Sequence, residues 1–180
     1  MLAWLYVVLV LSIIALIGAL MALYFLFKTR VPFVKTPSSA YREIIGQISP
    51  EADIKVIDLG CGDASVLLAI EKHRPEAHLE GYELSPAAYL QGRLKACLKK
   101  SNVRLYYRNF HKTDLSHADV VFCFLIASVM PRLEEKLLRE LKPGAKVISY
   151  GFTFPKWQPV LSIKNPEANR RSKIHIYKKT

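Results

Sequence analysis

The chain has 180 residues, of which 51% are hydrophobic, and a formal net charge of +11 at pH 7. This length suits one domain of medium size with an additional segment, and it excludes an array of large domains. The three cysteines include no C-x-x-C pair, and the five histidines show no metal-ligand spacing. The sequence therefore favours a reducing compartment, with neither a disulfide framework nor a metal site.

An uncharged apolar segment opens the chain, from Met1 to Phe27. As a helix it would be roughly 40 Å long, and about 20 apolar residues suffice to cross a bilayer core. A cleaved signal peptide is the alternative, but it normally starts with basic residues and ends at a small-residue cleavage site. Here Lys28, Arg30 and Lys35 follow the apolar run. We therefore expect a single-pass membrane anchor over residues 1–27, with the rest of the chain in the cytoplasm.

All of the net charge lies outside this anchor. Anionic lipids would attract such a surface by about 1 kcal/mol for each nearby basic residue. A nucleic acid is the competing partner, since the sequence pI is ≈ 9.6, but no basic stripe interleaved with aromatic residues stands out. We expect membrane lipids to contact the anchor and the basic surface, and we expect no nucleic-acid partner. A plain solvated surface also explains many of these charges.

A linker and a short helix are predicted over residues 28–50. The prolines at positions 32 and 37 favour an extended linker, and Pro37 suits the first position of a helix capped by Thr36. Ser49-Pro50 would end that helix. Its apolar face recurs at helical spacing and consists of Tyr41, Ile44, Ile45 and Ile48.

Apolar strand-like runs alternate with helix-like stretches through residues 51–180. The expected strands are 54–59, 77–83, 103–107, 119–125, 145–151, 160–164 and 173–178, and the expected helices are 65–73, 87–99 and 129–141. This alternation predicts an α/β fold, a Rossmann-like parallel sheet with right-handed crossovers. The last two strands, joined by the polar residues 165–172, would form an antiparallel hairpin at one edge. A ligand should bind beyond the carboxyl ends of the strands.

The candidate ligand site begins with the sequence D-L-G-C-G-D at residues 58–63. Gly60 and Gly62 would let the backbone approach a ligand closely, with Asp63 completing the turn, and Glu83 at the end of the next strand would bind two ribose hydroxyls. The turn reads G-x-G-D and lacks the third glycine of a pyrophosphate site, so S-adenosylmethionine fits better than NAD. Asp58 would then lie near the amino group of that cofactor. The glycines alone are also compatible with an ordinary strand–turn–helix corner.

Two further segments follow strand ends. Asn109 follows the third strand, where its side-chain carbonyl can accept a hydrogen bond from an adenine amino group. After the fifth strand, aromatic residues at 152, 154 and 157 would wall a narrow channel and face a cationic group. The alternatives are a turn role for Asn109 and simple packing of the aromatic rings against the N-terminal helix. The sequence contains no N-P-P-Y motif, which argues against methylation of nucleobase or glutamine amides.

The segments D-L-G-C-G-D, G-Y-E-L-S-P, L-E-E-K-L-L-R-E-L-K-P-G-A-K-V-I-S and F-T-F-P-K-W occur in that order. Together with the apolar N-terminus and V-P-F-V-K-T-P, they resemble a family of membrane-anchored protein lysine methyltransferases. Mitochondrial members of that family methylate the adenine nucleotide translocase or the c-ring protein of ATP synthase. The resemblance extends from about Pro32 to Pro159, and the F-x-F-P-x-W and P-F-V-x-T-P segments are its most specific parts.

The resemblance implies a class I (seven-strand) methyltransferase fold, S-adenosylmethionine as cofactor, and a lysine of an integral membrane protein as substrate. This lysine would lie near the membrane surface. By position, the implied cofactor contacts are Asp58, Gly60, Gly62 and Glu83. The implied rim of the active site consists of Phe154, Pro155 and Trp157.

The chain departs from the family pattern at three places. Ala64-Ser65 stand where Gly-Arg is frequent, Lys35 replaces a proline, and Asn109 stands where an acid is usual. The absence of a long targeting extension indicates a prokaryotic member with a substrate of its own. Two alternatives remain at this point: methylation of a lipid or quinone-like small molecule, and a membrane module that binds S-adenosylmethionine without turnover.

Overall fold

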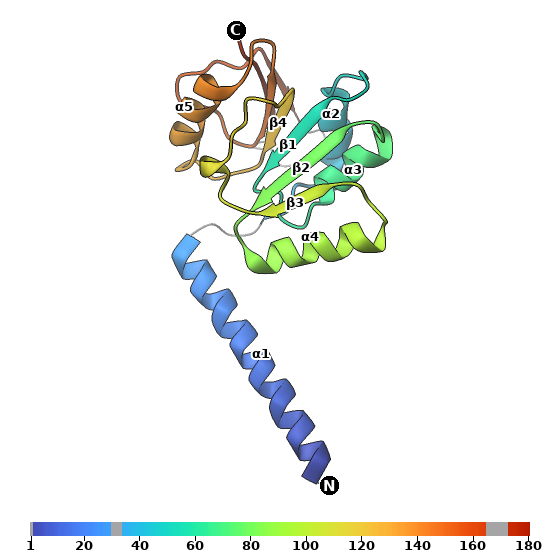
Figure 1. Cartoon of the computed structure of the whole chain (residues 1–180). Coiled ribbons are helices and arrows are strands. Elements are labelled where there is room, and N and C mark those ends of the chain that lie inside the picture. Colours follow the sequence, from blue (N-terminus) through green and yellow to red (C-terminus); the bar gives the residue numbers. More distant parts are fainter. Residues whose placement is uncertain (1, 30–33, 165–172) are drawn as a thin grey trace. The chain divides into compact units, whose positions relative to one another are not determined.

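The structure, a computed structural model, describes residues 2–29, 34–164 and 173–180. Its internal contacts divide the chain into two units, Met1–Val34 and Lys35–Thr180 (Figure 1). This division falls inside the segment 28–50 that the sequence assigns to a linker and a helix.

The first unit contains one long helix, α1 (Leu2–Thr29), which continues past the predicted end at Phe27. Its segment Ala3–Tyr24 has a mean hydropathy of 2.8, and none of that segment is buried. The Ser12 hydroxyl donates to the carbonyl oxygen of Val8 at 2.9 Å, which satisfies this polar group within the helix. By length and composition, this helix could cross a membrane.

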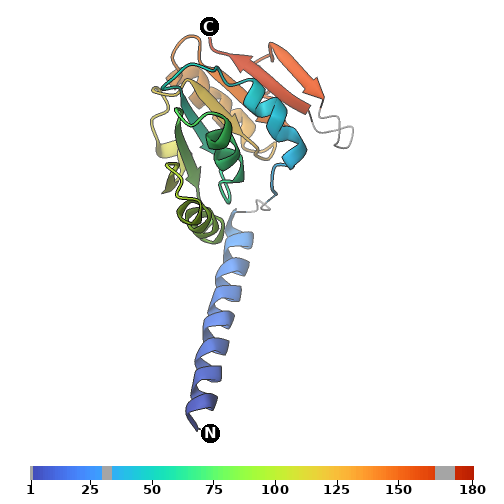
Figure 2. The same ribbon diagram turned by 90° about the vertical axis from the view of Figure 1, so that its right-hand side faces the viewer.

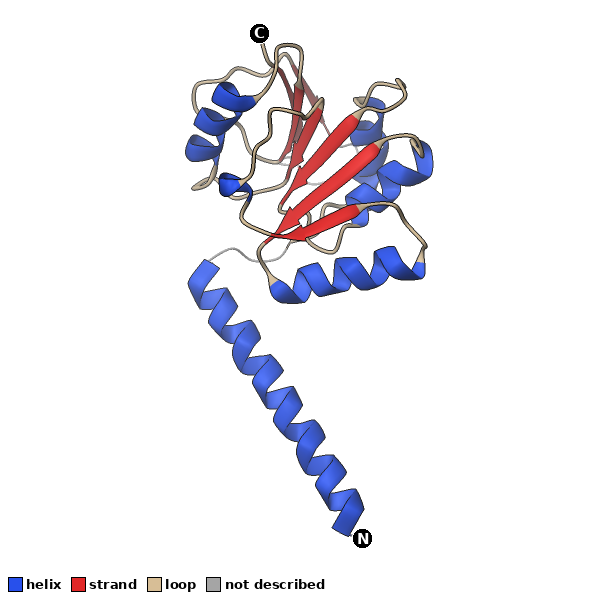
Figure 3. Ribbon diagram, viewed as in Figure 1, coloured by secondary structure: helices blue, strands red, loops and turns tan. Residues whose placement is uncertain are grey.

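The second unit alternates strands and helices, as the hydrophobic pattern predicts (Figure 3). In chain order its elements are η1 (Ser38–Ala40), α2 (Tyr41–Gly46), β1 (Lys55–Leu59), α3 (Ser65–His73), β2 (His78–Glu83), α4 (Pro86–Leu98), β3 (Arg104–Tyr107), η2 (Phe110–Lys112), β4 (Val120–Cys123), α5 (Met130–Glu140), β5 (Lys146–Tyr150), β6 (Leu161–Lys164) and β7 (Lys173–Lys178).

The strands form one seven-stranded sheet in the order β3-β2-β1-β4-β5-β7-β6. Neighbours from β3 to β5 are parallel, whereas β7 is antiparallel to both β5 and β6. Figure 2 shows β6 and β7, in orange and red, at one edge of the sheet. The strand order reverses between β1 and β4, and in such sheets ligands bind beyond the carboxyl ends at this reversal. The predicted seven-strand fold with an antiparallel terminal pair is confirmed.

Helices cover both faces of the sheet, with α5 on one side and α2, α3 and α4 on the other (Figure 1). Successive side chains of a strand point to opposite faces. On β1, Val56 therefore packs with the layer of α2 and α3, while Ile57 and Leu59 pack with α5. Central strands buried on both faces explain why their sequences are continuously apolar.

Two local expectations were wrong. The helix predicted from Pro37 is divided into η1 and α2, and Pro37 precedes η1 without a side-chain cap, so Thr36 is not a helix cap. The backbone N–H of Ala40 instead donates to the carbonyl oxygen of Pro37 at 3.0 Å. The strand predicted over 119–125 is shorter, because pairing of β4 with both neighbours ends at Cys123. The predicted hairpin loop 165–172 lies outside the described residues.

Candidate active site

A tight glycine turn connects β1 to α3. Gly60 and Gly62 have φ values of +78° and +55°, in the left-handed region that favours glycine. The backbone N–H groups of Gly60 and Cys61 both donate to the carbonyl oxygen of Tyr82, at 2.8 and 3.1 Å. A side chain at Gly60 would also meet Leu125 at 2.9 Å. The turn is thus fastened to the end of β2, and its glycines keep the backbone accessible at the carboxyl edge.

Glu83 lies at the end of β2, where its carboxylate accepts three backbone hydrogen bonds. Gly62 donates to Oε2 at 2.8 Å, and Leu84 and Ser85 donate to Oε1 at 2.7 and 2.6 Å. These bonds fix the carboxylate beside the glycine turn before any ligand binds. A carboxylate has about four lone-pair sites, so Oε2 keeps acceptor capacity for a further donor. This geometry fits the binding of a ribose hydroxyl.

Asp58 is buried on the central strand of the site, with 2% of its surface exposed. Among the described residues, none donates a hydrogen bond to its carboxylate. Burial, with a contribution from the charge of Glu83, raises the pKa of Asp58 well above its usual range. A buried acid without a donor beside a second acid is suited to a cationic ligand group, such as an ammonium.

The Asp63 side chain turns toward the protein. Its buried Oδ2 lies 2.8 Å from Lys35 Nζ and 2.6 Å from Lys95 Nζ, and Lys95 also contacts the Ser65 hydroxyl at 3.1 Å. Burial alone would raise the pKa of Asp63, but the two ammonium groups outweigh it and hold this pKa below its usual range. Asp63 therefore braces the glycine turn from behind, joining the start of the second unit to α4.

We expect Asp63→Asn to lower the free energy of unfolding by about 1–2 kcal/mol at pH 7, because the two lysines lose their charged partner and both are partly exposed. The folded-state pKa of Asp63 is depressed, so its contribution exists above the unfolded-state value of about 3.9 and is lost as pH falls through the folded-state pKa. Urea unfolding at several pH values measures this. A difference between parent and variant that stays constant in acid would contradict the ion-pair explanation.

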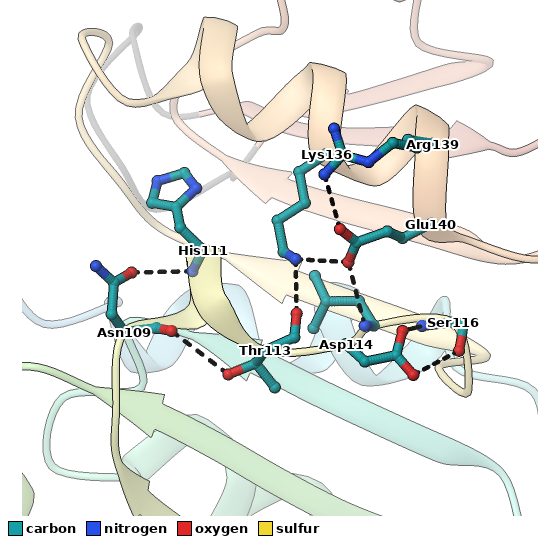
Figure 4. Close-up of polar contacts among 9 residues, drawn as sticks. Asn109, His111, Thr113, Asp114, Ser116, Lys136, Arg139 and Glu140 are labelled. Carbon is teal, nitrogen blue, oxygen red and sulfur yellow. Dashed lines mark hydrogen bonds and ion pairs between the residues drawn. The ribbon is translucent and has the colours of Figure 1, made fainter.

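Asn109 follows β3 and begins the short helix η2. Its side-chain oxygen accepts from the backbone N–H of His111 at 2.9 Å, as Figure 4 shows. The same segment is held to α5 by the buried Lys136, whose Nζ donates to the carbonyl oxygen of Thr113 at 2.6 Å and contacts Glu140 at 2.5 Å. Asn109 thus has the turn role in this structure, and a contact with adenine would have to use the remaining lone pair of its carbonyl.

The aromatic segment after β5 packs on the α5 side of the sheet. Phe154 is buried, with its ring edge-on to Tyr177 at 4.8 Å and stacked on Trp157 at 5.7 Å. The Phe154 backbone N–H donates to the Tyr177 hydroxyl at 3.2 Å. Pro155 is exposed and Trp157 is partly exposed. The packing partner of this segment is therefore β7, and only the last two residues present surface that a substrate can touch.

Glu134 of α5 holds this aromatic segment, which the sequence did not predict. It is 4% exposed, and its carboxylate accepts the backbone N–H groups of Lys156, at 3.0 Å to Oε1, and of Trp157. A signal was present: Glu134 lies at i+4 from Met130 and i−3 from Leu137 on the buried stripe of α5. An acid on an apolar helix face requires donors, here the backbone of the F-x-F-P-x-W segment.

We expect Glu134→Ala to release this segment, at a cost of about 1–3 kcal/mol in the free energy of unfolding, because two buried backbone donors lose their acceptor. Methyl transfer should slow while the affinity for S-adenosylmethionine stays unchanged, since the glycine turn and Glu83 are untouched. Thermal unfolding, a binding titration and an activity assay on the same preparation test this. Glu135→Ala, at the exposed neighbouring position, is the matched control and should resemble the parent in all three.

The predicted site residues form two groups in the structure. The glycine turn, Asp58 and Glu83 meet at the carboxyl ends of β1 and β2, whereas Phe154 and Trp157 belong to the segment held by α5 and β7. A separate hollow of about 730 Å³ opens at the amino ends of the strands, where Lys55, His78 and Arg104 begin β1, β2 and β3. Being at the opposite edge of the sheet, it is remote from the glycine turn. In the parts of the chain that are described, no group of three His, Cys, Asp or Glu residues could hold a metal ion.

The model of the ANTKMT methyltransferase domain matches residues 58–161 of the chain. The chain belongs to this family. The match begins at Asp58 and extends past Trp157, so it includes the glycine turn, Glu83 and the aromatic segment. The protein is therefore an S-adenosylmethionine-dependent methyltransferase, as the sequence predicted.

Curated relatives agree with this assignment. The chain is 31% identical over 155 residues to a protein-lysine N-methyltransferase of Saccharolobus islandicus, covering 84% of this chain and 95% of the relative. It is 33% identical over 137 residues to the adenine nucleotide translocase lysine N-methyltransferase of Mus musculus, covering 74% and 58% of the two chains. A lysine N-methyltransferase of Xenopus laevis, named for the c-ring protein of ATP synthase, is 31% identical over 153 residues, covering 79% and 66%. The chain thus spans less than two thirds of the two vertebrate relatives.

Solved structures share the fold. An RNA methyltransferase from Salinibacter ruber, in complex with S-adenosyl-L-homocysteine, superposes with a TM-score of 0.72 over 81% of this chain and 93% of its own, at 23% identity. A precorrin-6y C5,15-methyltransferase from Geobacter metallireducens gives a TM-score of 0.65 over 81% and 90%, at 17% identity. These likenesses establish the class I methyltransferase fold. The open glycine turn, the fixed Glu83 carboxylate and the buried Asp58 fit the cofactor of such enzymes.

Proposed function

We propose that this protein is a lysine N-methyltransferase whose substrate is a lysine of a neighbouring membrane protein, close to the membrane surface. The main support is the relative from Saccharolobus islandicus, a protein-lysine N-methyltransferase of which this chain covers 95%. The two vertebrate relatives, named for the ATP synthase c-ring protein and the adenine nucleotide translocase, support the same reaction. The apolar helix α1 supports a substrate within the same membrane.

The proposed cofactor contacts follow from the geometry of the carboxyl edge. Glu83 accepts the ribose hydroxyls, and Asp58 faces the ammonium of the methionine part, which its buried carboxylate would stabilise. Gly60 and Gly62 give the methionine part room beside the backbone, and Asn109 accepts from the adenine amino group. In this proposal the role of Asp63 is indirect, because its side chain is engaged by two lysines.

Bound S-adenosylmethionine supplies an electrophilic methyl group on its sulfonium. The protein must hold an unprotonated amine in line with this methyl and exclude water from it. A lysine has a reference pKa of about 10.4, and an apolar site lowers it, which favours the neutral amine. The amine then forms the new N–C bond as the C–S bond breaks, and the proton lost beforehand goes to water. Trp157 and Pro155 are proposed to line the approach of the lysine.

The proposed location is a membrane, with α1 as a single span and the methyltransferase domain in the cytoplasm. The basic residues at 28, 30 and 35 follow the apolar segment directly, and such residues favour the cytoplasmic side. We further propose that the boundary between anchor and domain lies within residues 28–50.

Methylation of a lipid or quinone-like small molecule is the second candidate, favoured by the same apolar helix. The test is to incubate the full chain with membranes of its source cell and methyl-labelled S-adenosylmethionine, then to separate lipid extract from protein. The proposal expects the label in a protein band, and none with the Glu83→Ala variant. Label confined to the lipid extract would favour the second candidate, and no label with a folded, cofactor-binding chain would indicate a module without turnover.

A further inference from the structure

Helix α4 carries an exposed ridge of leucines. Leu90, Leu94 and Leu98 are 63%, 60% and 75% exposed, and their spacing of four residues places them on one side of the helix. We call these three residues the leucine ridge. The opposite side of α4, which faces the sheet and the glycine turn, carries small residues. These are Ala88, Gly92 and Ala96.

Close packing explains why the inward side is small. A side chain at Gly92 would meet the backbone of the glycine turn, with the carbonyl carbon of Asp63 at 3.2 Å and the carbonyl oxygen of Gly62 at 3.3 Å. Helix α4 therefore lies directly against the turn, and the leucines are left outside. This is the reverse of an ordinary surface helix, whose apolar stripe faces the core. An exposed apolar stripe of this kind marks an interaction surface.

The surroundings of the leucine ridge are positively charged. The sequence from Leu84 to Thr113 contains no acidic residue. Arg93, Lys99 and Lys100 are exposed on or directly after α4. Leucines on one helix side with basic residues beside them are typical of helices that lie in the interface of an anionic bilayer.

The start of the second unit lies next to α4. Lys35, its first residue, is paired with Asp63, and Asp63 is paired with Lys95 of α4. Only residues 30–34 separate Lys35 from the apolar helix in the sequence, and such a connection extends at most about 18 Å. A bilayer that held the apolar helix would therefore keep the Lys35 end of the domain, and α4 with it, near its surface.

We infer that the leucine ridge docks onto the surface of an anionic lipid bilayer, with the leucines in the acyl boundary and the basic side chains at the headgroups. This inference rests on the membrane location proposed above. Because α4 begins three residues after Glu83, docking brings the cofactor edge of the sheet close to the membrane surface. A substrate lysine at that surface would then be within reach of the bound cofactor.

A fluorescence experiment on the full chain tests this inference. Cys97 is exposed on the ridge side of α4, whereas Cys61 and Cys123 are buried, so an environment-sensitive dye can be attached at Cys97 selectively. The labelled chain is reconstituted into vesicles of phosphatidylcholine and phosphatidylglycerol that carry a quencher near the headgroups. Interfacial helices lie about 5–10 Å deep, so we expect the shallow quencher to remove about half of the emission. The combined variant Leu90→Gln, Leu94→Gln and Leu98→Gln should lose this quenching.

The control label is placed at Glu135→Cys in a Cys97→Ser background, on the exposed side of α5, and should not be quenched. Equal quenching at both positions, quenching unaffected by the three glutamines, or a Cys97–Cys97 cross-link between two copies would overturn the inference. The readout needs no substrate, so its failure would leave the proposed methyl transfer standing. Conversely, a chain that docks but transfers no methyl group would contradict the proposed function alone.

Discussion

The Glu83→Ala variant is expected to bind S-adenosylmethionine at least about 100-fold more weakly than the parent. Two hydrogen bonds to a charged acceptor contribute about 1.5–3 kcal/mol each, and 1.4 kcal/mol corresponds to a factor of ten. The variant also frees the N–H groups of Gly62, Leu84 and Ser85, which loosens the glycine turn. Calorimetric titration of the full chain in detergent, with S-adenosylmethionine and with S-adenosylhomocysteine, measures the loss.

Glu80→Ala is the matched control for this result. Glu80 lies on the same strand and carries the same charge, but it contacts Tyr82 and His117 on the side of the hollow at the amino ends. Its removal should leave the dissociation constant unchanged. If Glu83→Ala bound the cofactor as the parent does, the ribose would have to lie elsewhere, and the assignment of the carboxyl edge of β2 would be wrong.

The Trp157→Ala variant is expected to retain cofactor binding and to transfer methyl groups about 10- to 100-fold more slowly. Correct placement of the reacting groups accounts for a large share of such barriers, and even a small misplacement costs about 100-fold. Loss of the indole leaves a gap beside Phe154 and Tyr177, at ring distances of 5.7 and 5.2 Å in the parent. Single-turnover kinetics with saturating cofactor measure the transfer step separately from binding.

A structural role for Trp157 would give a different pattern. Its rings pack against β7, so Trp157→Ala will also lower the melting temperature, and a lower melting temperature alone does not support a role in transfer. Trp157→Phe keeps an aromatic ring at this position and is expected to restore most of the stability and part of the rate. A folded Trp157→Ala protein with the parental transfer rate would show that the aromatic segment serves packing only.

The fold was predictable because its signals are local and repeated. Alternation of apolar strands and helices, with a glycine turn after the first strand, indicated the parallel sheet and its antiparallel terminal pair. The limits of α3, Ser65–His73, were predicted without error because Ala64 is left-handed and the buried stripe of the helix is regular. The wrong cap at Thr36 shows the opposite case: one residue of displacement before Pro37 is decided by backbone geometry and leaves no trace in the pattern.

The candidate site was predictable only where a single position carries the chemistry. Glu83 follows its strand directly, so its place at the carboxyl edge follows from the strand. The brace of Asp63 by Lys35 and Lys95 joins three segments far apart in the sequence, and no spacing reveals it. The same is true of Tyr177, which reaches the aromatic segment only because β7 inserts between β5 and β6.

The most direct measurement is the chemical identity of the methylated product. Membrane proteins labelled by the full chain from methyl-labelled S-adenosylmethionine are hydrolysed in acid, and the amino acids are separated by chromatography. The label should co-elute with an ε-N-methylated lysine and be absent from the reaction with Glu83→Ala. Label in another amino acid, or in the lipid fraction alone, would contradict a lysine methyltransferase that acts on membrane proteins.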